Sequence, residues 1–230
     1  MACWSATIGD VEIDGPFRVI IGAGEQRYEG WIPTDQHQLD LAHQSSFQAF
    51  LGSRRVDGFL CEHVWEHLDL DESRQAAVNC FSFLKPGGCL RIAVPDRLFP
   101  DEAYQRTVLV GGPGPADHPA ADHKVVYDLD LLVSVLTPAG FEVTPLEWWD
   151  ENGTFHVSDW NSERGTVYRS SVFDHRNADY RAGNGPPGFT SLIVDAIRPR
   201  DAALVDAHSR HFEGSTQDPE PALWTPRYRR

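Results

Sequence analysis

The sequence predicts an α/β protein in which helices pack against a mainly parallel sheet. Short apolar, β-branched runs alternate with helical patterns as far as residue 141, as in parallel strands joined by crossover helices. Polar residues and glycines directly follow the predicted strands, at the carboxyl ends where such sheets bind ligands. With 230 residues and a hydrophobic fraction of 41%, the chain can bury a substantial core.

The first predicted strand, residues 18–21, leads into the turn Gly22-Ala23-Gly24. The strand is apolar and β-branched, as expected when both faces are covered. Two glycines around one small residue allow a sharp turn and the close approach of a ligand. Asp35 stands eleven residues after the second glycine, at the end of the apolar piece 30–34. A carboxylate at such a strand tip can accept hydrogen bonds from ribose hydroxyls.

The next part of the chain predicts two helices and two further strands. Leu39-Asp40-Leu41 is compatible with a brief strand, and Ser45 or Ser46 is a candidate N-cap for the following helix. Asp71 is the expected cap of the second helix, which the turn 85–88 ends with proline and glycine. The predicted elements are a helix over 44–51, a strand over 56–61, a helix over 71–84 and a strand over 89–94, closed by Pro95-Asp96.

Residues 97–124 differ in composition, because glycine and proline forbid regular structure over much of the segment. We expect a mobile flap there, carrying Asp117, His118, Asp122 and His123, with His123 as the best anchored proton acceptor. Beyond it the pattern predicts a helix over 127–136, a strand over 141–149, a hairpin through Asn152-Gly153 to 154–157 and a last strand over 190–197. One domain over residues 1–200 is expected, with 97–124 and 150–189 as additions; the order of the tail 201–230 is left open.

The composition limits the function classes. The formal charge is −14, with 34 acidic against 20 basic residues, which argues against binding a nucleic-acid backbone. The four cysteines form no CxxC pair, so zinc-ribbon and dithiol redox motifs are not expected, and buried thiols fit a reducing compartment. We see neither a signal peptide nor a membrane span, and we expect a cytoplasmic protein without a metal. The oligomeric state is left open.

Three segments together resemble class I S-adenosylmethionine (SAM)-dependent methyltransferases. They are IIGAG at 20–24 followed by Asp35, VDGFLCEHVWEHL at 56–68, and FLKPGGCLRIAVPD at 83–96. The resemblance covers roughly residues 18–198. It implies a Rossmann-like three-layer αβα sandwich whose mostly parallel sheet has an antiparallel C-terminal strand. It also implies methyl transfer from SAM, and we expect a small-molecule acceptor.

The resemblance also implies roles for particular residues. The turn Gly22, Ala23 and Gly24 would pass under the methionine and ribose parts of SAM, and Asp35 would hold the ribose hydroxyls. Asp40 and Leu41 would lie near adenine. Glu62 and His63 would face the methionine end and the acceptor, where Glu25 or Glu62 suits the positive sulfonium. His63 and His123 are the candidate catalytic residues.

One departure from the family keeps another function class open. The segment 25–30 leaves room for only about one turn of helix before Asp35, whereas a helical crossover needs a dozen or more residues. A noncatalytic binding protein with the same fold is therefore the alternative.

A more remote alternative is a zinc peptidase, because His63-x-x-Glu66-His67 matches H-x-x-E-H. That chemistry requires both histidines on one face of a helix. The pattern here follows a predicted buried strand instead, which argues against it.

Overall fold

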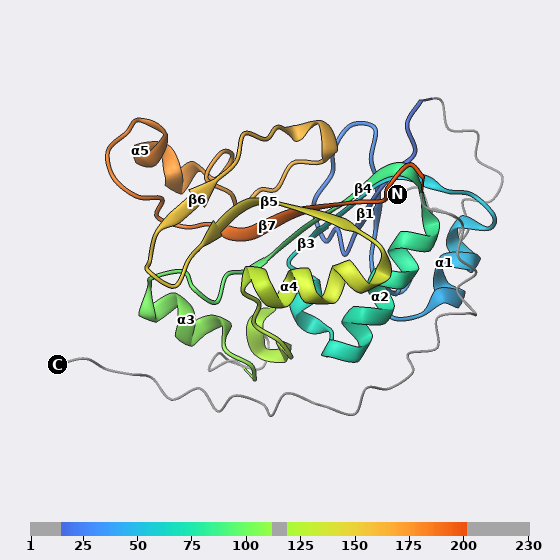
Figure 1. The fold of residues 1–230 in the computed structure, drawn as a ribbon, viewed down its shortest axis with the longest axis horizontal. Helices are drawn as coiled ribbons and strands as arrows, with labels where there is room; N and C mark the ends of the chain where they lie inside the picture. Colours follow the sequence, from blue (N-terminus) through green and yellow to red (C-terminus); the bar gives the residue numbers. More distant parts are fainter. Residues whose placement is uncertain (1–14, 112–118, 202–230) are drawn as a thin grey trace.

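The computed structural model describes residues 15–111 and 119–201. Predictions that fall on residues 1–14, on 112–118 with Asp117 and His118, and on 202–230 lie outside the described residues. The described part forms a seven-stranded sheet in the order β2-β1-β3-β4-β7-β5-β6 (Figure 1). Its strands are β1 (Arg18–Ile21), β2 (Ile32–Thr34), β3 (Val56–Glu62), β4 (Leu84–Pro95), β5 (Glu142–Trp149), β6 (Phe155–Val157) and β7 (Ser191–Ile197).

The strand directions confirm the predicted sheet. β1 pairs in parallel with β2 and β3, and β3 pairs in parallel with β4. The last strand, β7, lies between β4 and β5 and is antiparallel to both. β6 folds back on β5 through the expected hairpin, in which Gly153 has a positive φ of 73°. The Rossmann-like α/β architecture that the methyltransferase resemblance implies is thus confirmed.

The three longest helices cover one face of the sheet. α1, α2 and α4 lie together below it in Figure 1, over the larger hydrophobic cluster, which includes Phe47, Phe59 and Leu90. The opposite face is covered by irregular segments: Trp31, Trp160 and Val167 pack over a smaller cluster. The helices are α1 (Gln44–Leu51), α2 (Leu70–Phe83), α3 (Glu102–Val108), α4 (Leu129–Leu136) and α5 (Ala178–Arg181), with 3-10 turns at Trp65–His67, Pro119–Asp122, Thr137–Ala139, Ser162–Arg164 and His175–Asn177.

The helix caps differ from the prediction. α1 spans the predicted residues, but His43 is its N-cap, and Ser46 Oγ instead accepts a hydrogen bond from the Asp40 N–H at 2.8 Å. α2 is capped by Asp69 rather than Asp71, in a capping box in which Glu72 bonds back to the Asp69 N–H. The box fits because the side chain three residues after Asp69 is a glutamate, a signal that the sequence contained.

The structure also differs from the predicted secondary structure in three segments. Residues 39–41 form a loop rather than a strand, because the N–H groups of Leu39 and Asp40 bond locally, to the Asp35 carbonyl and to Ser46 Oγ, and not to a neighbouring strand. β4 begins at Leu84 instead of residue 89, since Leu84 pairs with Val56 before a register shift. Residues 102–108, inside the segment expected to be irregular, form α3, which Asp101 caps through the Tyr104 N–H.

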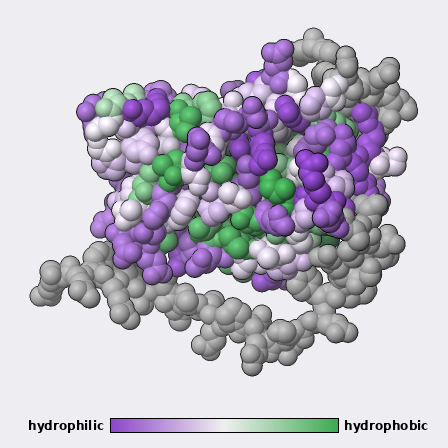
Figure 2. Space-filling view, turned by 45° about the horizontal axis from the view of Figure 1, so that its top comes forward, coloured by the Kyte–Doolittle hydropathy of each residue, from purple (hydrophilic) through white to green (hydrophobic). Residues whose placement is uncertain are grey.

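On the face shown in Figure 2, hydrophobic residues appear in small groups among hydrophilic ones. Within residues 15–111 and 119–201, none of the helices is long and apolar enough to cross a bilayer.

Candidate functional site

The glycine turn after β1 is held tightly against β2. Ala23 donates its N–H to the Thr34 carbonyl at 2.8 Å, and Thr34 Oγ1 bonds the Ile20 carbonyl. Gly22 and Gly24 both have a positive φ, at 63° and 50°. The residues up to β2 form turns without a helix, as the short crossover predicted. The turn is therefore positioned by the sheet itself and has no helix N-terminus beside it.

Gly22 admits no side chain. A Cβ atom built on it would lie 2.3 Å from Cγ2 of Val64, whereas a Cβ on Gly24 would meet nothing within 4 Å. The side of Gly22 on which a Cβ atom would stand is thus filled by Val64, in the segment after β3. The turn offers its backbone, rather than side chains, to whatever binds there.

Substituting Gly22 tests this packing. We expect Gly22→Ala to lower the unfolding free energy more than Gly24→Ala. A positive φ costs each alanine about 1–2 kcal/mol, but only the alanine at position 22 also clashes with Val64. Chemical denaturation of the two variants measures the difference. Val64→Ala should recover part of the loss in a double variant. Equal destabilisation by the two glycine variants would contradict the close contact.

Asp35 and Asp40 lie at different points of this edge. Asp35 stands just after β2, and its Oδ1 accepts the Gly24 N–H at 3.2 Å. Asp40 accepts the Ala42 N–H at 2.9 Å and lies 3.3 Å from Nδ1 of His43. Asp35 thus steadies the glycine turn, while Asp40 lies with Leu41 beside a cavity.

Two cavities meet at the carboxyl ends of β1 and β3. The larger has a volume of about 820 Å³ and the smaller about 420 Å³. They share Gly22, His63 and His67. Of the residues predicted from the sequence, Gly22, Ala23, Glu25, Glu62, His63 and His123 line the larger cavity, Asp40 and Leu41 line the smaller, and Gly24 and Asp35 line neither.

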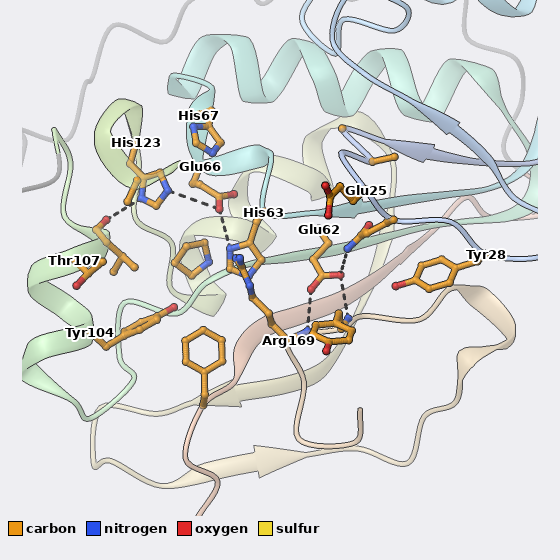
Figure 3. A pocket seen from close by; sticks show the side chains of 18 residues that line it. Glu25, Tyr28, Glu62, His63, Glu66, His67, Tyr104, Thr107, His123 and Arg169 are labelled. Carbon is orange, nitrogen blue, oxygen red and sulfur yellow. Dashed lines mark hydrogen bonds and ion pairs between the residues drawn. The ribbon is translucent and has the colours of Figure 1, made fainter. Parts of the chain in front are cut away.

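Glu62 ends β3 and holds one wall of the larger cavity (Figure 3). Its carboxylate, 7% exposed, accepts a hydrogen bond from Nε2 of Gln26 at 2.6 Å. It also accepts the backbone N–H groups of Tyr168 and Arg169 at 3.0 and 2.8 Å. Burial, reinforced by the charge of Glu62, raises the pKa of nearby Tyr28 to about 12. Glu62 thus joins the glycine loop to the segment that precedes β7.

His63 occupies a strained position at the centre of the site. Among the described residues it is the only one other than glycine with a positive φ, 56°. Its Nδ1 lies 3.1 Å from Oε1 of Glu66, and its Nε2 lies 2.9 Å from Oγ of Ser191 on β7. Such strained backbone persists only where the surroundings enforce it, and it concentrates at functional sites.

The H-x-x-E-H pattern does not form the helix that a zinc peptidase requires. His63 precedes a 3-10 turn of only three residues, Trp65–His67. The two histidines take different partners, since Nδ1 of His67 lies 2.8 Å from Oδ1 of Asp122. The structure therefore does not support the peptidase alternative.

Glu66 and His67, which are neighbours in the sequence, meet the distant His123 on one wall of the larger cavity. Glu66 is fully buried, and neither of its carboxylate oxygens has a hydrogen-bond partner. His123 is 6% exposed, and its Nδ1 lies 3.1 Å from the Val108 carbonyl. Burial lowers the pKa of His123, which favours the neutral imidazole.

Several cavity residues were missed by sequence reasoning. Tyr104, Thr107 and Val108 come from α3, in a segment predicted to lack helices, and Tyr168, Arg169 and Phe189 come from the long connection before β7. No motif marks either group. Only the Asp101 cap, with a helical spacing after it, signalled α3.

Asp96 follows a predicted strand end, where a side chain could face a ligand. In the structure it is buried in the interior instead. It is 1% exposed and accepts the Leu98 and Trp149 N–H groups, each at 2.8 Å. Burial raises its pKa to about 6. It therefore fastens the end of β4 to β5.

Comparisons with known proteins assign no activity by sequence: no known family profile and no curated protein matches the chain. Among solved structures it is similar to a SAM-dependent methyltransferase from Thermotoga maritima, with 13% identity over 80% of this chain and 83% of that one and a TM-score of 0.45. A SAM-dependent methyltransferase from Archaeoglobus fulgidus has 17% identity, coverages of 80% and 86% and a TM-score of 0.42. An O-methyltransferase family protein from Burkholderia thailandensis has 11% identity and a TM-score of 0.45; the match covers 81% of this chain and 52% of that one.

Proposed function

We propose that the protein transfers a methyl group from SAM to a small-molecule acceptor. The observation that carries the proposal is the pair of cavities at the carboxyl ends of β1 and β3, which meet at the glycine turn. Parallel α/β sheets bind ligands at this edge. The larger cavity, about 820 Å³, falls within the usual size range of small-molecule pockets.

The residues present fit SAM. The turn 22–24 would pass under its methionine and ribose parts, and Asp35 would take the ribose hydroxyls. Asp40 and Leu41 in the smaller cavity would contact adenine. Glu25 and Glu62 line the larger cavity, where negative charge favours a sulfonium. When bound, SAM supplies the electrophilic methyl group.

The remaining task for the protein is positioning, because in-line orientation of a nucleophile accounts for much of such a reaction. The larger cavity would hold the acceptor between α3 and the segment before β7, with Tyr104 and Phe189 as apolar walls. A base is needed only for an acceptor that carries a proton. His63 and His123 both line this cavity and are the proposed proton acceptors.

SAM binding tests the proposal by calorimetry. We expect Gly24→Val to weaken binding at least tenfold, because a β-branched residue is strained at a φ of 50° and the turn would move. The matched control is Gly153→Val, which meets the same kind of strain, at a φ of 73° and also in open space, in the β5–β6 turn. Equal affinity in wild type and Gly24→Val would refute this placement of SAM.

Asp35 variants separate two roles of that carboxylate. Asp35→Asn can still accept the Gly24 N–H, whereas Asp35→Ala cannot. If Asp35 holds the ribose hydroxyls, both variants should weaken SAM binding; if it only steadies the turn, Asp35→Asn should bind as wild type does.

The noncatalytic alternative is favoured by one observation, the absence of a helix over residues 22–31, which are all described. It predicts SAM binding without turnover. Incubation with SAM and panels of hydroxyl, amine and carbon acceptors, read by mass spectrometry for the demethylated product, distinguishes the two functions.

A further inference from the structure

We propose that Glu66, His67 and His123 form a binding site for a divalent transition-metal cation at the wall of the larger cavity. One ligand atom from each residue lies within 4.8 Å of the other two. The cation site itself does not depend on the proposed methyl transfer. It replaces the expectation from sequence that the chain holds no metal.

The state of Glu66 is the first argument. A carboxylate that is fully buried is costly unless it is paired or coordinates a metal. Both oxygens of Glu66 lack a hydrogen-bond partner, although Nδ1 of His63 lies 3.1 Å and Nε2 of His123 lies 3.9 Å from Oε1. Figure 3 shows this carboxylate directed between the two imidazole rings. A cation there would supply the positive counter-charge that the Glu66 carboxylate lacks.

The outer contacts of the two histidines are the second argument. Nδ1 of His67 lies 2.8 Å from Asp122 Oδ1, and Nδ1 of His123 lies 3.1 Å from the Val108 carbonyl oxygen. Since each of these oxygens accepts a hydrogen bond, each Nδ1 carries the proton and each Nε2 keeps its lone pair. Metal-binding histidines in proteins usually have one ring N–H bonded in this way to a carboxylate or a backbone carbonyl.

The ligand types indicate the class of metal. Two imidazole nitrogens and one carboxylate oxygen suit zinc, iron, manganese or cobalt, whereas Mg²⁺ and Ca²⁺ prefer oxygen ligands alone. Two ligand atoms about 2.1 Å from one ion lie at most about 4.2 Å apart, and about 3.4 Å apart in a tetrahedral site. Binding would therefore draw the ligand atoms, which now lie within 4.8 Å of one another, together by up to about 1.4 Å.

Three protein ligands leave coordination positions open toward the cavity, as in catalytic rather than structural metal sites. Water or an oxygen donor of a small molecule would fill them. If the proposed function holds, this donor belongs to the methyl acceptor, and His123 acts as a ligand in place of the base role considered above.

Cobalt binding by the full-length protein, stripped with a chelator, tests the site without SAM or an acceptor. We expect calorimetry to show one Co²⁺ bound per chain. The bound Co²⁺ should give visible absorption bands, which should disappear when zinc displaces it. Glu66→Gln should weaken binding at least tenfold while leaving the melting temperature of the metal-free protein unchanged or higher, since it removes a buried charge. His67→Ala, at a side chain that is 27% exposed, provides a second loss variant with little effect on the core.

Two controls complete the experiment. His37→Ala removes an exposed histidine outside the cavity and should bind Co²⁺ like wild type. Asp122→Asn should weaken affinity while preserving the absorption bands, because Asp122 positions His67 without being a ligand. The proposal fails if wild type binds less than one Co²⁺ per chain, or if Glu66→Gln and His67→Ala both bind as tightly as wild type. Loss of SAM binding or turnover alone would bear on the proposed function and not on this site.

Discussion

Asp195→Asn is expected to lower the free energy of unfolding by about 3–5 kcal/mol, the cost of breaking a buried ion pair. Asp195 on β7 faces Arg91 on β4 in the sheet register. Two hydrogen bonds of 2.7 and 3.0 Å join them, and both residues are at most 3% exposed. The substitution leaves the guanidinium charge buried without its counter-charge. Urea unfolding of the two proteins measures the loss.

Arg91 also explains why the effect would reach the candidate site. Its Nη1 donates to the carbonyls of Asn161 and Gly165 at 2.7 and 2.6 Å, and its guanidinium lies 4.8 Å from the ring centre of Trp160. The pair thus holds the segment that leads to the cavity residues Tyr168 and Arg169. We expect the cavity wall to loosen along with the loss of stability.

An exposed ion pair provides the matched control. Glu102→Gln breaks the ion pair between Glu102, 79% exposed, and Arg106, 65% exposed. It should lower the free energy of unfolding by no more than about 0.5 kcal/mol. Arg91→Met combined with Asp195→Leu should cost less than the two single variants added together, because it removes both charges. An Asp195→Asn loss as small as that of Glu102→Gln would contradict the assignment.

Asp96 should make stability fall as the pH rises from about 4 to 6. Burial raises its pKa from 3.8 to about 6 in the folded protein. Between these values the folded state holds the proton while the unfolded state has released it, so stability decreases with rising pH. Below this window both states are protonated, and above it both are ionised and the loss of stability is complete. At about 1.4 kcal/mol for each unit of difference between the two pKa values, the full loss is about 3 kcal/mol.

Comparison with Asp96→Asn isolates this contribution, because asparagine does not titrate. The variant should lose a constant amount of stability, since its amide cannot accept both N–H groups that Asp96 accepts. Apart from this constant loss, the unfolding free energy of Asp96→Asn relative to wild type should increase by about 3 kcal/mol from pH 3 to pH 8. The carboxyl carbon of Asp96 should titrate near pH 6 in NMR spectra. A midpoint near 4 would overturn the prediction.

The sequence by itself determined most of the sheet and the helical face of this protein. The strands around residues 19, 58, 91 and 194 and the helix over 44–51 were predictable, because apolar periodicity reports which side of an element is buried. The glycine turn was equally visible, since a sharp turn with a positive φ selects glycine locally. The edge of the sheet that carries the candidate site was also predictable, because strand–helix alternation indicates parallel strands, whose carboxyl ends meet at one edge.

Tertiary structure decided which side chains meet at that edge. Glu66 and His123 lie 57 positions apart, and no local pattern predicts that the 3-10 turn after β3 and the segment before α4 enclose one carboxylate. Tertiary structure also decided that Glu62 accepts hydrogen bonds from the segment before β7. It likewise decided that Asp96 is buried in the interior. Periodicity encodes burial along one element, whereas a site depends on distances between elements, and these are set only when the whole core packs.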